Sequence, residues 1–81
     1  MAQFILPGLL LDRVAASRDT ELSTLAQAAP FAYISGDERR VRATAEQAAR
    51  LRAAAEALLR TSFNGSAEEH AARTALRTLS G

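Results

Sequence analysis

The single histidine of this 81-residue chain is the first candidate for chemistry, because it follows two acidic residues. His70 stands directly after Glu68 and Glu69 near the start of a predicted helix, where a histidine could act as a general base. Adjacent residues of a helix do not face each other, however, and no serine or cysteine nucleophile stands in an elbow motif. We therefore interpret His70 as a surface side chain and predict that the protein is not an enzyme.

Metal and cofactor chemistry has no support in the sequence either. The chain has no cysteine, and its one histidine cannot form an imidazole cluster. A di-iron helical bundle needs Glu-x-x-His pairs on facing helices, and the four glycines match no phosphate-binding loop. We expect no catalytic residue, no metal site and no cofactor.

The second candidate is a group of arginines in the middle of the chain, Arg39, Arg40 and Arg42. Arginine on a helix can contact the phosphates or the base edges of nucleic acid. Acidic residues are interleaved with the arginines of this region, however, and the formal net charge of the chain is only +1. We therefore expect the group to orient an acidic partner protein and do not expect nucleic acid as a partner. A small nucleic-acid-binding accessory protein is kept as the alternative function.

The elements that position these side chains are predicted from apolar periodicity. The most hydrophobic stretch of the chain lies near the N-terminus and ends at Leu11. It contains Pro7, which is tolerated in the first turn of a helix, where its missing N–H would be unpaired anyway. We predict an extended lead-in at residues 4–6, a helix at about 7–17 and a second helix at about 20–29.

The middle of the chain reads as one long Ala/Arg helix over residues 35–63. Ser35 is its predicted cap, and Asn64-Gly65 its predicted stop, because both residues of that pair adopt left-handed geometry at little cost. A second capping signal at Ser66 opens a last helix over residues 66–80. A short connection makes two such helices antiparallel neighbours.

A second interpretation of the residues around the arginine group remains open. Residues 31–35 include strand-forming side chains and could pair with residues 40–44 as a short hairpin. Thr44 and Gln47 would then form the capping box of a shorter helix. An isolated two-stranded hairpin is weak unless it packs on helices. We favour the extended connector followed by the long helix.

The predicted fold class is therefore all-α, a small helical bundle in a single domain of residues 1–81. Two short, apolar N-terminal helices occupy residues 1–34. The long central helix of residues 35–63 and the C-terminal helix of residues 66–80 form an antiparallel helical hairpin.

Apolar residues cover several faces of the first predicted helix, and this coverage implies burial on more than one side. A domain this small, with no disulfide or metal to stabilise it, usually gains stability from association. We predict a small non-enzymatic protein-interaction module, of adaptor, co-chaperone or inhibitor type, that binds another protein or forms a homo-oligomer. Its apolar anchors would be Leu9, Leu10 and Val14. A phage structural or connector protein is a further alternative.

Two features of the whole chain concern its origin and location. Alanine is abundant and all ten strongly basic residues are arginine, a composition typical of a GC-rich bacterial or phage genome. No apolar run approaches the roughly 20 residues that span a bilayer, and no basic segment precedes the N-terminal apolar run. We predict a cytoplasmic location and no membrane partner.

Overall fold

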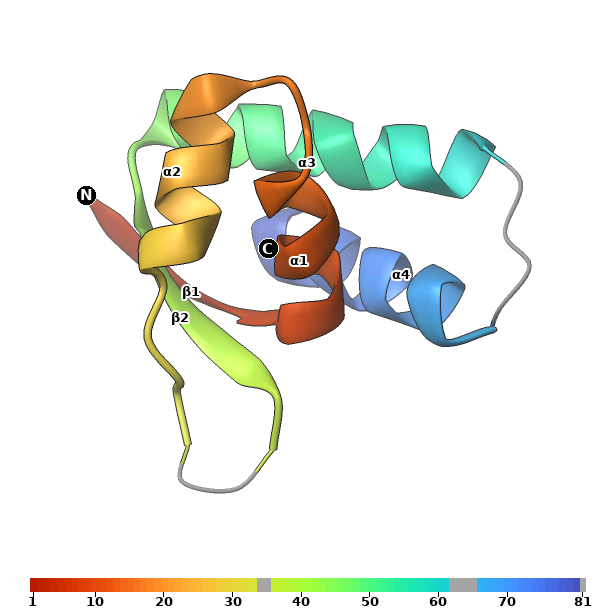
Figure 1. The fold of residues 1–81 in the computed structure, drawn as a ribbon, viewed down its shortest axis with the longest axis horizontal. Coiled ribbons are helices and arrows are strands. Elements are labelled where there is room, and N and C mark those ends of the chain that lie inside the picture. The colour runs from red at the N-terminus through yellow and green to blue at the C-terminus, as the bar shows by residue number, and fades with distance from the viewer. Residues whose placement is uncertain (34–35, 62–65, 81) are drawn as a thin grey trace.

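A computed structural model describes residues 1–33, 36–61 and 66–80 of the chain, and in them a two-stranded antiparallel sheet packs against four helices (Figure 1). Between the strands the chain forms two short helices, and after the second strand it forms a helical hairpin. The elements in chain order are β1 Ala2–Pro7, α1 Gly8–Ala15, α2 Thr20–Ala28, β2 Glu38–Ala43, α3 Ala45–Arg60 and α4 Ser66–Ser80.

The predicted all-α fold is wrong, because two segments form strands. The predicted lead-in at residues 4–6 belongs to β1, and the first part of the predicted helix over residues 35–63 is β2. Burial alternates along both strands: Leu6 and Val41 are buried, whereas their neighbours in sequence are more exposed. This period of two fits a strand that is covered on one face only, and it places Arg40 and Arg42 of β2 toward solvent.

The alternative hairpin interpretation is correct about the capping box that begins α3 and wrong about the strand that pairs with β2. Thr44 caps α3: its side chain accepts a hydrogen bond from the Gln47 N–H at 3.1 Å, and the Gln47 side chain accepts one from the Thr44 N–H at 2.9 Å. The strand that pairs along all of β2 is β1, however. Phe31 makes only an isolated antiparallel bridge, to Arg39.

The other predicted helices are present with shorter or equal bounds. α1 and α2 lie within the predicted ranges 7–17 and 20–29, and α4 coincides with the predicted range 66–80. α3 and α4 run antiparallel and lie against each other, as the short connection implies (Figure 1). The predicted cap Ser35 and the predicted helix stop Asn64-Gly65 lie outside the described residues. No described helix is both long enough and apolar enough to cross a bilayer.

The core lies between the inner face of the sheet and the helices. Alanines such as Ala55 on α3 and Ala75 on α4 are fully buried, and their small side chains let these two helices approach each other closely. The bulk of the core comes from both strands and from α1 and α3. Its largest fully buried side chains are Leu6, Leu10, Leu11, Val41 and Leu51.

Candidate functional site

The predicted apolar anchors lie mainly in the core of the protein. Leu10 and Val14 are 1% and 3% exposed, because the helical period turns them toward the other elements. Leu9 is half-buried and reaches a surface groove. Leu9 is thus the only one of the three predicted anchors that a partner could contact directly in this structure.

The three predicted arginines lie on β2 and not on a helix, so they alternate between the two faces of the sheet. Arg39 points to the inner face, where its guanidinium lies 4.3 Å from the centre of the Phe31 ring and 3.8 Å from the carboxylate of Asp37. Arg40 and Arg42 lie on the outward face and are exposed. Arg39 therefore stabilises the end of the sheet, and the other two arginines are available to a partner.

Arg40 and Arg42 differ from most arginines of this protein in their charge environment. No carboxylate of the described residues lies within 4 Å of either guanidinium, and Arg40 instead donates a hydrogen bond to the Ala32 carbonyl at 3.3 Å. The outward face of β2 thus carries two adjacent positive charges that the described part of the chain does not neutralise. The arginines that do lie within 4.0 Å of a carboxylate are Arg13, Arg39, Arg50, Arg52, Arg60 and Arg73.

The hydrogen bonds of the sheet leave one edge of β1 open. The Gly8 N–H donates to the Asp37 carbonyl at 2.9 Å, so these two opposite residues form a hydrogen-bonded pair of the antiparallel ladder. Hydrogen-bonded and non-hydrogen-bonded pairs alternate along an antiparallel ladder. The even-numbered residues of β1 therefore bond to β2, whereas Gln3, Ile5 and Pro7 direct their backbone groups away from it. Pro7 has no N–H and loses no ladder bond at such a position. Within the described segments, no backbone group pairs with this outer edge.

The opposite edge of the sheet is partly covered. The Arg40 N–H donates to the Pro30 carbonyl at 2.8 Å, and the Ala32 N–H donates to the Glu38 carbonyl at 2.9 Å. These bonds place the chain around Phe31 alongside β2. They also show independently that Glu38 and Arg40 direct their backbone groups away from β1, as the alternation requires. The outer edge of β1 is therefore the longer open edge.

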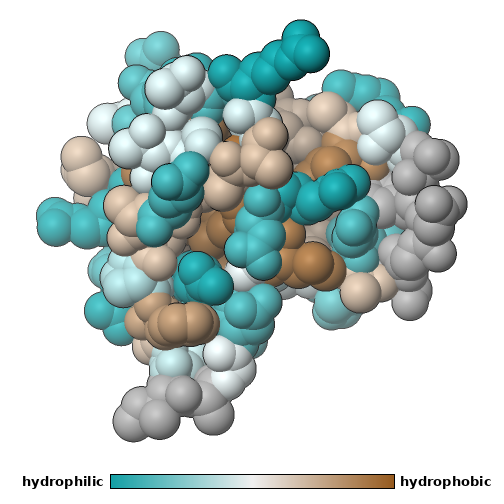
Figure 2. All heavy atoms as spheres, viewed as in Figure 1, coloured by the Kyte–Doolittle hydropathy of each residue, from teal (hydrophilic) through white to brown (hydrophobic). Residues whose placement is uncertain are grey.

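A groove of about 330 Å³ adjoins the end of β1. Ile5, Pro7 and Leu9 contribute apolar side chains to it, and Ala71 and His70 of α4 also line it. On the face shown in Figure 2, hydrophobic residues reach the surface near the centre, with hydrophilic residues around them. The complete lining of the groove is Ile5, Pro7, Gly8, Leu9, Asp37, Glu38, Ala67, His70, Ala71 and Thr74.

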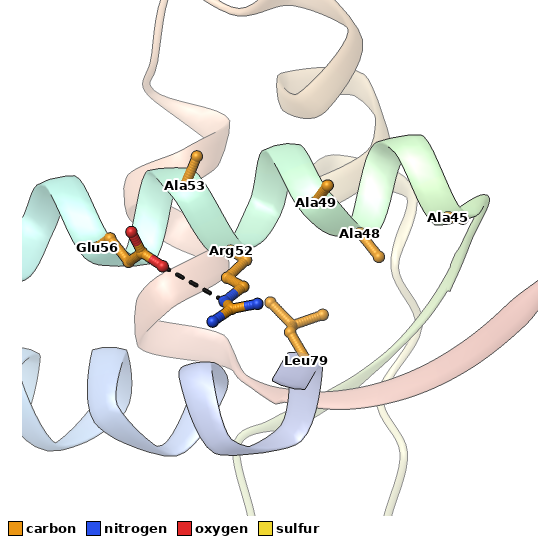
Figure 3. Close-up of a pocket in the computed structure, with 7 residues that line it drawn as sticks. All are labelled: Ala45, Ala48, Ala49, Arg52, Ala53, Glu56 and Leu79. Carbon is orange, nitrogen blue, oxygen red and sulfur yellow. Dashed lines mark ion pairs between the residues drawn. The ribbon is translucent and has the colours of Figure 1, made fainter. Parts of the chain in front are cut away.

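A second hollow, of about 450 Å³, lies between α3 and the end of α4 (Figure 3). Most of its lining is alanine, and Leu79 closes the side formed by α4. The two charged residues of the hollow pair with each other, with 3.3 Å between Arg52 Nε and Glu56 Oε1. The hollow is larger than the groove, but its arginine and its glutamate neutralise each other. Neither charge is therefore left unpaired to bind a ligand.

One further charged cluster has a structural role. Asp19 caps α2 by accepting a hydrogen bond from the Leu22 N–H at 3.2 Å, and Arg50 of α3 binds both the Asp19 carboxylate, at 2.5 Å, and that of Glu21. The bond from the Leu22 N–H, together with the nearby Arg50 guanidinium, lowers the pKa of Asp19 below its ordinary value, although partial desolvation opposes this. The cluster ties α2 to α3, and each charge in it has a partner.

The described residues include no group of three or more histidine, aspartate and glutamate side chains that could hold a metal ion. The open edge at Gln3 and Ile5 was not predicted from the sequence. The one sequence feature that indicates it is an uncharged segment of strand length, residues 2–7. Comparisons with models of protein families, with curated proteins and with solved structures find no match to this chain.

Proposed function

We propose that this protein is a small, non-enzymatic interaction module that binds another polypeptide on the outward side of its sheet. One observation carries the proposal. Arg40 and Arg42, which have no acidic partner among the described residues, lie directly opposite Ile5 and Gln3 on the uncovered face of the sheet. Unneutralised charge, an exposed apolar side chain and an open strand edge therefore occur together.

The residue types on and near this surface support the proposal. Ile5 is 36% exposed, and the exposed Arg40 and Arg42 lie beside it on the outward face. Arginine is enriched in protein–protein interfaces and provides many of their energetically dominant contacts. Two adjacent arginines also favour an acidic partner, because complementary charge accelerates association and fixes its register.

The proposal keeps the predicted class of function and changes the contact residues. Leu9, Arg40 and Arg42 keep a direct role from the predicted set, and Ile5 is added to them. Leu10 and Val14 support the surface by packing in the core, and Arg39 supports the end of β2. The partner surface is therefore a sheet with an adjoining groove, instead of the apolar helix face that the sequence suggested. A cytoplasmic location stays a prediction from the sequence.

The experiment is a selection of binding peptides from a random library on the immobilised protein. Selected peptides are then measured against two double variants with the same change in net charge. R40E/R42E reverses the charges of the proposed surface. R18E/R77E is the matched control, because no carboxylate of the described segments lies within 4 Å of these two arginines either.

We expect R40E/R42E to weaken the selected peptides by about tenfold or more, a loss of ~1.4 kcal/mol of binding free energy, and R18E/R77E to leave them nearly unchanged. The proposal would be contradicted by a selection that yields no binding peptide. It would also be contradicted by peptides that bind both double variants equally well.

A further inference from the structure

The open edge of β1 is complementary to an extended polypeptide. Gln3 and Ile5 each direct one N–H and one carbonyl outward, so an added antiparallel strand can make about four backbone hydrogen bonds with these two residues. Strand addition of this kind is a general mode of peptide recognition, in which the backbone bonds give affinity and the alternate side chains give specificity. The beginning of β1 lies at the margin of the molecule, where such a strand can approach (Figure 1).

Side chains give this edge little of the protection that most edge strands have, although α4 lies beside it and forms the other wall of the groove near Pro7. Natural sheets guard their edges with charged side chains, prolines, bulges or covering elements. Residues 2–7 carry no charge, and their only proline, Pro7, stands at the end of the strand. The edge is therefore suited to accept a strand along Gln3 and Ile5.

The charges beside the edge specify the partner. A residue added opposite Gln3 or Ile5 points to the outward face, the face that also carries Arg42 and Arg40. The backbone of the added strand and that of β2 are then two strand spacings apart, about 10 Å. Long arginine and glutamate side chains can meet across this distance above β1. Carboxylates at these two positions would neutralise both arginines.

The other end of the edge has the opposite preference. Glu38 lies opposite Pro7 on the outward face, and both Glu38 and Asp37 line the groove. A carboxylate added opposite Pro7 would be repelled there, whereas an apolar side chain could enter the groove beside Leu9. The fitting segment is therefore acidic at the Gln3 end and neutral or basic at the Pro7 end.

We propose that the partner is an extended acidic segment of another protein that adds to β1 as a new edge strand, with carboxylates directed at Arg40 and Arg42. This inference rests on the proposed function and names the partner of the same surface. A second copy of this chain fits less well, because its own β1 has no acidic residue and would leave both arginines unneutralised.

The test compares Gln3→Pro with Gln3→Ala. Both variants remove the glutamine side chain, but only the proline removes the outward N–H and blocks an approaching strand. Because the Gln3 N–H points away from β2, neither change removes a bond of the β1–β2 ladder, and thermal unfolding checks that both variants fold alike. The probe is a short synthetic peptide that alternates valine with glutamate, and its control has lysine in place of each glutamate.

We expect the glutamate peptide to bind the wild type and Gln3→Ala with similar affinity and to bind Gln3→Pro about tenfold more weakly. We expect R40E/R42E to bind the lysine peptide in preference to the glutamate peptide. Equal binding to Gln3→Pro would overturn strand addition, and the proposed function would still stand if library peptides depend on Arg40 and Arg42.

Three other results would also overturn the inference. The first is that the glutamate peptide does not bind the wild type. The library selection would then still test the proposed function separately. The second is a solution mass equal to two chains that Gln3→Pro returns to one, which identifies a second copy as the occupant. The third is an oligothymidylate that binds as tightly as the glutamate peptide and is insensitive to Gln3→Pro, which identifies a preference for any polyanion.

Discussion

Ile5 and Arg40 lie directly opposite each other on the outward face of the sheet, although α1 and α2 separate them along the chain. Their pairing joins an apolar side chain from the N-terminal strand to a charged one from the middle of the sequence. The β1–β2 ladder that creates this neighbourhood also sets which backbone groups of β1 face outward. The stability of the ladder and the integrity of the proposed surface are therefore linked.

Replacing Gly8 by alanine should destabilise the end of the ladder. A methyl group at Gly8 would collide with the Asp37 carbonyl, which accepts the hydrogen bond that closes the sheet at this point. Overpacking of this kind costs about 1–3 kcal/mol. Urea unfolding should show the loss, and the Gln3 edge should bind the glutamate peptide less well. A Gly8→Ala protein as stable as the wild type would contradict the described contact.

Leu9 and Leu10 should respond differently to truncation, because only Leu10 is fully buried. Leu10→Ala should lower the free energy of unfolding by about 2–5 kcal/mol, as expected for a buried leucine whose removal leaves a cavity. Leu9→Ala should cost much less stability and should weaken peptide binding at the groove. The opposite order of stabilities in chemical denaturation would show that α1 packs through a different face.

The capping box at the start of α3 should make a measurable contribution to stability. Thr44→Ala removes the side chain that accepts the Gln47 N–H bond, and the loss of such a cap costs about 1 kcal/mol. Thr44→Ser keeps the hydroxyl group and should recover most of this loss. If alanine and serine gave equal unfolding midpoints, the cap would not contribute.

Stability should fall in acid partly because of Asp19. Its pKa in the folded protein lies below the ordinary value of 3.8, first because of the bond from the Leu22 N–H and also because of Arg50. The unfolded chain therefore takes up a proton before the folded one does as the pH decreases. The contribution of Asp19 is present above pH 3.8 and is lost as the pH falls through the lowered pKa.

Asp19→Asn isolates this effect, because asparagine can still cap α2 but does not titrate. Unfolding free energies of the two proteins should differ at neutral pH and converge in acid, below the ordinary aspartate pKa. Parallel curves over this range would mean that Asp19 does not stabilise the folded state through its charge.

The helices could be predicted from sequence, whereas the sheet could not. α1, α2 and α4 follow from local signals, namely apolar periodicity and residues that cap or interrupt helices. Strand β2 alternates arginine with Val41 and Ala43, but its first residue, Glu38, and the nearby Ala45 favour a helix. Local propensity therefore predicted a helix where the structure has a strand. The partner strand lies far away in sequence, and only tertiary packing selects that pairing.

Only part of the candidate surface could be predicted from the sequence, because the strand pairing that completes it is not local. Arg40 and Arg42 form a local cluster that the sequence shows directly. The part played by Gln3 and Ile5 depends on the register of the sheet and on which residues of β1 bond to β2. A shift of one residue would turn a different set of groups outward, so only the folded structure reveals the open edge.

The most direct test of the account is amide hydrogen exchange in the free protein, measured residue by residue along β1. We expect the Phe4 and Leu6 amides, which face β2, to exchange slowly, and the Gln3 and Ile5 amides to exchange at nearly the rate of an unstructured chain. Such alternation would show an edge that is open and ready to accept a strand. Protected Gln3 and Ile5 amides would show that the edge is already occupied and would contradict the proposed binding surface.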